Sequence, residues 1–209
     1  MSGPGKWTEP KKLPNGRTWE SMREEFEEGV SLFTACWQAP IERVAIENPA
    51  EVGADRIVNA VAAWDRFHEP LIVIDFGTAI TFDCVNGEPA YVGGTIHPGI
   101  GISLDALATR TAKLPRLDID VTPDHPIGTT TVKAIHSGAL YGFGGLVDRM
   151  VEVLSGQLTP DRERARTIAT GGMAELIKPY TKTIDEIDTE LTLTGLQLIY
   201  GLNCQGKDA

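Results

Sequence analysis

The clearest hydrophobic pattern in the chain is a run of four aliphatic residues, Leu71–Ile74, which ends in the acidic residue Asp75. An apolar run without polar alternation is typical of a strand that is buried on both faces. A second β-rich run follows over 81–85, and Asn86-Gly87 predicts a tight turn into a return strand over 90–92. The pattern therefore predicts a β-hairpin whose first strand carries a carboxylate at its end.

Helix and strand patterns alternate along the rest of the chain. Ile57, Val61 and Trp64 recur at helical spacing and predict a helix over 51–64. Further helices are expected over 18–28, 103–112, 130–140, 146–154, 173–177 and 191–200, and further strands over 43–46 and 166–170. Residues 93–101 are expected as a glycine-rich connection and 116–128 as a loop. Alternation of this kind without internal repeats predicts the α/β class.

The composition narrows the class of protein. The chain has 209 residues, of which 42% are hydrophobic, so it can form one large domain or two small ones. The formal net charge of −10 argues against nucleic-acid binding and against adhesion to an anionic membrane, because both need a basic face. No stretch approaches the length of a membrane span, and the first thirty residues lack the apolar region of a leader peptide.

The cysteines indicate the redox environment of the protein. Cys36, Cys84 and Cys204 are far apart and odd in number, which suits a reducing environment and offers no zinc spacing. We therefore expect a soluble cytoplasmic protein with no nucleic-acid and no membrane partner.

The end of the buried strand suits phosphate and cation chemistry. In the turn after Asp75, Gly77 lets backbone N–H groups approach an anion, Thr78 adds a hydroxyl donor, and the carboxylate can hold a cation. The alternative is a hairpin whose aspartate only caps its turn. For the glycine-rich connection over 93–101, an ordinary turn cluster is the corresponding alternative.

Several acid- or glycine-bearing turns follow one another along the chain. They are Gly-Ala-Asp-Arg at 53–56, Asp-Phe-Gly-Thr at 75–78, Gly-Thr-Ile-His-Pro-Gly at 94–99, Gly-Thr-Thr-Thr at 128–131 and Thr-Gly-Gly at 170–172. The set and its order resemble the type III pantothenate kinases, members of the acetate kinase/sugar kinase/Hsp70/actin superfamily. The resemblance covers about 42–203 and includes the Leu-Thr-Leu-Thr-Gly-Leu segment near the end.

The resemblance implies an α/β fold of two ribonuclease-H-like halves, as in actin-like ATPases, with ATP between them. It implies a complete second half over 71–209, a remnant of a truncated first half over 42–70, and a divergent N-terminal segment over 1–41. The implied reaction transfers the γ-phosphoryl group of ATP to the primary hydroxyl of pantothenate, giving 4'-phosphopantothenate for coenzyme A biosynthesis. The implied cofactors are ATP, magnesium and a monovalent cation, potassium or ammonium, and the implied assembly is a homodimer that buries the pantothenate site.

The resemblance also implies individual roles. Asp55 would be the general base, and Gly53, Ala54, Asp55, Arg56 and Thr131 would contact pantothenate. Asp75 would hold the monovalent cation, Gly77 and Thr78 would contact ATP at its phosphates, and Gly171-Gly172 would form a turn against adenosine. Independently, the positive end of a helix dipole favours an ionised Asp55 that is ready to orient a hydroxyl.

Each of these roles has a structural alternative. Asp55 can be a residue of the first helical turn that pairs with Arg56, and Thr131 can lie near a helix start without any ligand. The Gly171-Gly172 pair can be a plain turn that leads into a helix.

The sequence departs from the family pattern in two places. Type III enzymes open with a strand running into Asp-X-Gly-Asn-Thr, which holds the ATP phosphates and magnesium, and residues 1–41 carry no such motif. The family tends to have a tyrosine seven residues before the glycine of Gly-Ala-Asp-Arg, where this chain has Ile46. Losing a group that stabilises transition-state charge can cost several kcal/mol.

Three explanations of these departures are open. The chain is an incomplete version of a working kinase, a catalytically inactive dimeric paralogue that only binds a ligand, or a subunit whose phosphate site another chain completes. The missing opening motif favours the inactive paralogue. The retained charged residues of the turns favour the kinase, because a drifting pocket tends to lose them. A phosphatase or sugar kinase on the same fold is disfavoured, because Gly-Ala-Asp-Arg does not suit the usual motifs for those substrates.

Overall fold

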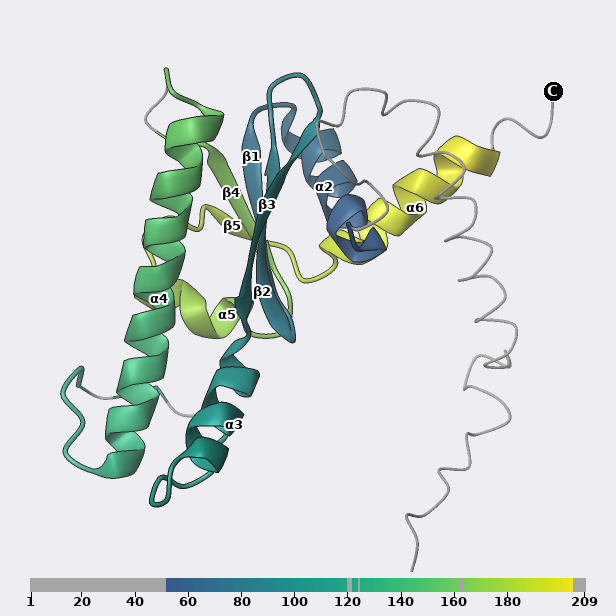
Figure 1. Cartoon of the computed structure of the whole chain (residues 1–209). Helices are drawn as coiled ribbons and strands as arrows, with labels where there is room; N and C mark the ends of the chain where they lie inside the picture. Colours follow the sequence, from purple (N-terminus) through teal and green to yellow (C-terminus); the bar gives the residue numbers. More distant parts are fainter. Residues whose placement is uncertain (1–51, 120–121, 124, 162–163, 205–209) are drawn as a thin grey trace, which may run out of the picture. The chain divides into compact units, whose positions relative to one another are not determined.

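The computed structural model describes residues 52–119, 122–123, 125–161 and 164–204 (Figure 1). The helix expected over 18–28, the strand expected over 43–46 and Ile46 lie outside the described residues.

A five-stranded mixed sheet forms the centre of the described fold. Its strands are β1 (Leu71–Phe76), β2 (Ala79–Val85), β3 (Tyr91–Pro98), β4 (Arg166–Thr170) and β5 (Glu186–Ile187), in the order β3-β2-β1-β4-β5. The first three strands form an antiparallel meander, and β4 and β5 add parallel strands beside β1. A mixed sheet of this kind fits the α/β class that the sequence predicted.

Helices cover both faces of the sheet. The helices are α2 (Ala54–Phe67), α3 (Ile100–Arg110), α4 (Thr131–Leu158), α5 (Ala174–Ile177) and α6 (Leu191–Cys204), with a 3-10 turn η2 at Lys178–Tyr180. Side chains of α2 and Leu191 of α6 pack on one face, and side chains of α3, α4 and α5 pack on the other (Figure 1). The two helical layers explain why β1 is apolar at consecutive positions.

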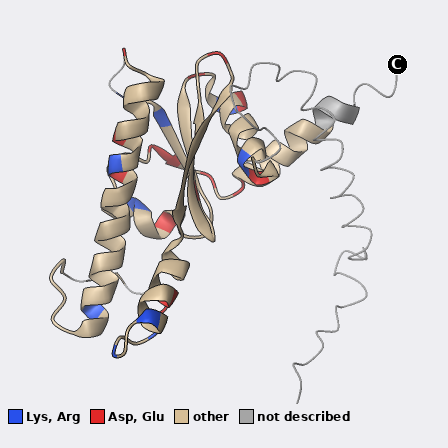
Figure 2. Ribbon diagram, in the orientation of Figure 1, with Lys and Arg blue, Asp and Glu red and all other residues tan. Residues whose placement is uncertain are grey.

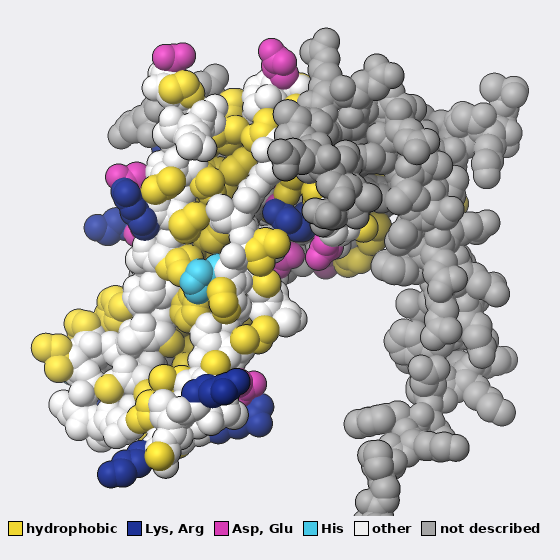
Figure 3. Space-filling view, viewed as in Figure 1, with side chains coloured by type: hydrophobic (Ala, Val, Ile, Leu, Met, Phe, Trp, Pro, Cys, Tyr) yellow, Lys and Arg dark blue, Asp and Glu magenta, His cyan; other side chains and the backbone are white. Residues whose placement is uncertain are grey.

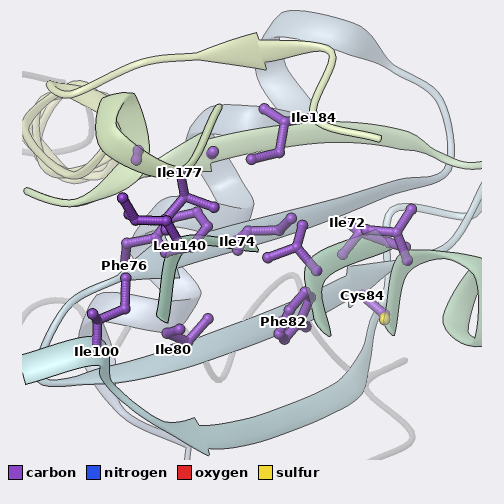
Figure 4. Packing of buried hydrophobic residues seen from close by; sticks show 14 of the residues in the cluster. Ile72, Ile74, Phe76, Ile80, Phe82, Cys84, Ile100, Leu140, Ile177 and Ile184 are labelled. Carbon is purple, nitrogen blue, oxygen red and sulfur yellow. The ribbon is translucent and has the colours of Figure 1, made fainter. Parts of the chain in front are cut away.

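Strand β1 divides its side chains between two cores. Ile72, Ile74 and Phe76 point into the larger core with Leu140 of α4, as the close-up in Figure 4 shows. Leu71 and Val73 point the opposite way, into a smaller core under α2. All four aliphatic residues of the run are fully buried, so the expectation of a strand covered on both faces is confirmed.

Two expectations about the elements are wrong. Residues 93–98 continue strand β3 instead of forming a connection, and they pair with β2 as far as Pro98. The segments expected as separate helices over 130–140 and 146–154 form one helix, α4. Glycines inside α4 do not end it, because the helix packs along the sheet and Gly144 lies against the backbone of Tyr180.

The surface of the described part carries mixed charge. Figure 2 shows basic and acidic residues interspersed along the ribbon. Within the described residues, no helix is both long enough and apolar enough to cross a membrane, the 28-residue α4 included.

Candidate functional site

The acidic end of β1 lies under the helix α2. Asp75 pairs in register with Thr81 of β2 on one side and with Thr170 of β4 on the other. Its carboxylate faces α2, where the side-chain amide of Asn59 lies 3.4 Å from Oδ2. The side chains under α2 are therefore apolar along most of β1 and polar at the end of β1, where Asn59 and Asp75 meet.

The electrostatic environment of Asp75 is negative. Burial raises the pKa of Asp75 above its ordinary value, and the charges of Asp55 and Asp83 raise it further. The hydrogen bond from Asn59 opposes the rise. A half-buried carboxylate beside two others is a place where a bound cation would be favoured.

The first turn of α2 carries the Gly-Ala-Asp-Arg residues. Gly53 occupies the N-cap position and makes no side-chain hydrogen bond to the helix, which begins at Ala54. Asp55 is exposed, and its Oδ1 accepts a hydrogen bond of 2.9 Å from the backbone N–H of Arg56. The Arg56 guanidinium turns away to Asp83, so Asp55 pairs with Arg56 through the backbone N–H and not through the side chain.

Asp83 is the buried partner of Arg56. Its side chain is 0% exposed, and its Oδ1 accepts from Arg56 Nε and from Tyr91 Oη, both at 2.6 Å. Its Oδ2 accepts from Thr81 Oγ1 at 2.9 Å. A buried carboxylate with these three donors meets the requirement that a charge inside a protein be paired and hydrogen-bonded.

The expected nucleotide turns lie beside Asp75. Gly171 has a φ of 90°, and a Cβ there would lie 2.6 Å from Asp75 Oδ1 and 2.7 Å from the Phe76 backbone, so only glycine fits this close approach. Gly172 and Thr78 are exposed. The N–H of Gly77 donates to the carbonyl of Ala79 within the turn, so this particular donor is already engaged.

Thr131 does not join the other candidates within one chain. It is an exposed residue at the start of α4, the helix on the opposite face of the sheet from α2. Its neighbour Thr130 caps the helix by accepting from the backbone N–H of Lys133. Asp55, Arg56, Asp75 and Gly171 are therefore gathered in one cluster, while Thr131 is separate.

The structure adds polar residues that the sequence patterns did not single out. They are Asn59, Asp83, Tyr91 and Thr192. Thr192, at the start of α6, donates to Asn59 Oδ1 at 2.7 Å and so connects the Leu-Thr-Leu-Thr-Gly-Leu segment to Asp75. A detectable signal was present, because Asn59 and Asp83 are polar residues inside otherwise buried stretches, and such residues need a partner.

The described residues of this cluster do not have the geometry of a metal centre. Among the residues that the structure describes, His, Cys, Asp and Glu form no group of three or more that could hold a metal ion. The described part has a hollow at the start of α4 near His136 and another along the second half of α4 near Asp148. The chemistry of the cluster is that of an exposed carboxylate, a guanidinium and glycine turns, which suits an anionic substrate and phosphate.

Comparison with known proteins gives the family. A model of the type III pantothenate kinases matches residues 18–153. The chain is 56% identical over 161 residues to the type III pantothenate kinase of Desulfotalea psychrophila, covering 77% of this chain and 60% of that protein. It is 49% identical over 157 residues to that of Desulfatibacillum aliphaticivorans, covering 75% and 60%. The chain thus spans about three fifths of the length of these curated relatives.

A solved structure supports the fold. A Baf family protein from Campylobacter jejuni superposes with a TM-score of 0.55 at 23% identity, covering 78% of this chain and 69% of that one. At this identity the likeness concerns the fold alone. The sequence match begins at residue 18, inside the 1–41 segment, and the domain boundary at 41/42 stays a prediction. On the extent and identity of these matches, the chain belongs to the type III pantothenate kinase family.

Proposed function

We propose that this chain phosphorylates the primary hydroxyl of pantothenate with ATP. The observation that carries the proposal is the gathering of two sets of turns on one face of the sheet. Asp55 and Arg56, from the expected pantothenate turn, lie with Asp75 and Gly171, from the expected nucleotide turns. Family membership supports the same reaction, and nothing in the comparisons favours the inactive paralogue.

Asp55 is the proposed general base. Phosphoryl transfer depends on positioning and on charge neutralisation more than on covalent help from the protein. An exposed carboxylate in the first turn of a 14-residue helix can accept a hydrogen bond from a substrate hydroxyl, orient its oxygen and take its proton.

Arg56 is the proposed contact for the pantothenate carboxylate. Among the described residues, its Nε is engaged by Asp83, and no hydrogen bond is made from its terminal nitrogens. Two free N–H-bearing nitrogens in one plane match the two oxygens of a carboxylate. Gly53 and Ala54, beside it at the helix start, would let the chain of pantothenate pass close to the backbone.

The nucleotide is proposed to lie at the opposite end of the cluster. Thr78, exposed after β1, would donate its hydroxyl to a phosphate oxygen, and Gly77 would leave room for that approach. Gly171 and Gly172 would form the backbone surface under adenosine. The close approach of Gly171 to Asp75 keeps these two regions adjacent.

Asp75 is the proposed ligand of a monovalent cation, potassium or ammonium. The fit lies in its negative surroundings, since the charges of Asp55 and Asp83 raise its pKa. A bound cation would neutralise part of the phosphate charge. For magnesium, the described residues offer no group of three ligands, so no residue is assigned to it.

A homodimer is proposed to bring Thr131 to the pantothenate of a partner. Thr131 lies on the face of the sheet opposite Asp55, so its expected contact requires a second copy. Figure 3 shows apolar side chains gathered along one side of the described part. Exposed large apolar residues of the described part include Ile96 of β3, Ile102 of α3 and Tyr141 of α4. Sedimentation at the mass of a monomer at micromolar concentration would contradict the dimer.

The proposed reaction belongs in the cytoplasm, where ATP is present and where the free thiol of Cys84 stays reduced. It requires neither a nucleic-acid nor a membrane partner.

The kinase proposal is tested by a coupled assay of ADP release with ATP, magnesium, potassium and pantothenate. Asp55→Asn is expected to lose activity by orders of magnitude. Asp65→Asn, which alters an exposed carboxylate on the same helix, is the matched control and should keep wild-type activity. Wild-type protein that binds pantothenate without turnover would support the binding-only paralogue, and equal activity of the wild type and Asp55→Asn would remove Asp55 from the mechanism.

A further inference from the structure

We propose that Asp83 is a positioning residue for substrate recognition, which holds the Arg56 guanidinium so that its terminal nitrogens face the carboxylate of the substrate. This inference rests on the proposed function, because it takes Arg56 as the contact for the pantothenate carboxylate. Asp83 itself touches no substrate in this account. It acts through Arg56.

The first support is the way in which Asp83 holds Arg56. The contact is a single one, from Nε to Oδ1 at 2.6 Å, and not the two-pronged contact that an arginine and a carboxylate commonly form. Attachment through Nε leaves both terminal nitrogens available. The second carboxylate oxygen of Asp83 is instead occupied by the hydroxyl of Thr81 at 2.9 Å.

The second support is the packing on either side of the guanidinium. The carbon at its centre lies 5.8 Å from the centroid of the Tyr91 ring, and the hydroxyl of the same tyrosine donates to Asp83. Gly94 lies close to Arg56, since a Cβ there would be 3.0 Å from the Nη2 atom and 1.9 Å from the Phe82 carbonyl oxygen. Tyr91 and Gly94 therefore restrict the guanidinium to a narrow range of orientations.

The third support is that a simpler pairing was open to Arg56. Asp55 is its direct neighbour and exposed, yet the guanidinium pairs with a carboxylate buried in the middle of strand β2. The Asp55 carboxylate therefore makes no contact with the guanidinium, and the guanidinium is held by Asp83. A buried partner fixes an arginine more firmly than an exposed one, because solvent does not compete for the hydrogen bond.

The test compares two substrates that differ only in the group that Arg56 is proposed to recognise. Pantothenate carries a carboxylate, and pantothenyl alcohol carries a hydroxyl in its place. In the full chain, Asp83→Asn is expected to raise the KM for pantothenate at least tenfold and to leave the KM values for ATP and pantothenyl alcohol within about twofold. The preference of the wild type for pantothenate over pantothenyl alcohol should shrink by the same factor.

Asp148→Asn is the matched control. Asp148 is also a carboxylate held by threonine hydroxyls, those of Thr181 and Thr183, but it lies on α4 away from the cluster. Its substitution should lower the melting temperature without changing the preference between the two substrates. A preference that Asp83→Asn leaves unchanged would overturn the inference while the kinase proposal stands.

A second variant covers the case in which Asp83→Asn does not fold. Tyr91→Phe keeps the ring over Arg56 and removes only the hydroxyl that donates to Asp83. We expect it to reduce the preference for pantothenate several-fold, less than Asp83→Asn. An unchanged preference in Tyr91→Phe, with Asp83→Asn unfolded, would count against the positioning role.

A measurement without substrate separates this inference from the proposed function. In NMR spectra of the labelled protein, the Nε–Hε signal of Arg56, assigned by its loss in Arg56→Lys, should exchange slowly with water. The protection should disappear in Asp83→Asn and remain in Asp148→Asn. Fast exchange in the wild type would refute the claim that Asp83 holds Arg56. Slow exchange in a protein that fails to phosphorylate pantothenate would refute the proposed substrate, but not the contact between Asp83 and Arg56.

Discussion

Asn59 of α2 and Asp75 of β1 hold the helix over the acidic end of the sheet, with 3.4 Å between the Asn59 amide nitrogen and Asp75 Oδ2. The same asparagine accepts a hydrogen bond of 2.7 Å from Thr192, so one buried side chain joins β1, α2 and α6. Asn59 is 1% exposed, so bulk solvent does not compete for either hydrogen bond. The arrangement fixes the position of Asp75 relative to the first turn of α2, where Asp55 and Arg56 lie.

Replacing Asn59 by leucine should therefore destabilise the protein. Leucine has a similar size, but it leaves Asp75 and Thr192 without their buried partner, which costs about 1–3 kcal/mol of unfolding free energy. Thr192→Val, which removes one of the two bonds, should cost about 1 kcal/mol. Urea denaturation of the three proteins measures both values. A leucine variant as stable as the wild type would show that Asn59 does not hold the elements together.

Asp75 predicts a pH dependence with a definite sign. Burial first, and then the charges of Asp55 and Asp83, raise its pKa in the folded protein above the ordinary value of 3.8. The folded state therefore binds this proton more tightly than the unfolded state does, and the stability due to Asp75 is full below 3.8 and falls as the pH rises through the folded-state pKa.

Asp75→Asn removes that dependence. We expect the variant to be more stable, relative to the wild type, at pH 7 than at pH 3.5. Thermal or urea unfolding at a series of pH values gives the difference. A difference that stays constant over this range, or that grows on acidification, would contradict the raised pKa.

The proposed cation at Asp75 makes a separate prediction. Potassium chloride should raise the melting temperature above that in sodium chloride at equal ionic strength, because binding to the folded state alone stabilises it. The difference should vanish in Asp75→Asn. Equal melting temperatures of the wild type in the two salts would contradict the proposal that Asp75 binds potassium.

The contact between α2 and α6 is tested by two glycine substitutions. A Cβ at Gly195 would lie 2.2 Å from the carbonyl oxygen of Val58, so Gly195→Ala must push the helices apart and should cost about 1–3 kcal/mol. Gly142, exposed in α4, has nothing within 4 Å of such a Cβ, and Gly142→Ala should stabilise by about 0.5–1 kcal/mol. If both alanines shift the urea midpoint in the same direction, the close approach of α2 and α6 is wrong.

The inner strands β1 and β4 could be predicted from the sequence, and the reason is burial. Leu71–Ile74 and 166–170 lie in the centre of the sheet, where neighbouring strands and helices cover both faces. The start of strand β3 was predicted, but its continuation over 93–98 was missed because Gly93 and Gly94 are typical of a turn. Gly94 is instead needed in the strand, since a side chain there would meet the Phe82 carbonyl. That requirement depends on the neighbouring strand and leaves no local pattern.

The candidate site also contains residues that the sequence could indicate and residues that only the fold reveals. Asp55, Asp75 and the Gly171-Gly172 turn could be named as candidates from the sequence, because each ends or begins an element and forms part of a recognisable motif. Asn59 and Asp83 could not be assigned a role, because their partners come from other elements that only the fold brings together. Thr131 lies on the other face of the sheet, so its expected contact depends on an assembly that one chain does not contain.

The central claim is that the carboxylate of Asp55 enables phosphoryl transfer to pantothenate, and phosphorus NMR of the reaction tests it most directly. With ATP, magnesium, potassium and pantothenate, the purified chain should produce a new phosphomonoester signal, which Asp65→Asn retains and Asp55→Asn loses. The absence of this signal from the wild-type reaction, or its appearance at the same rate with Asp55→Asn, would contradict the account.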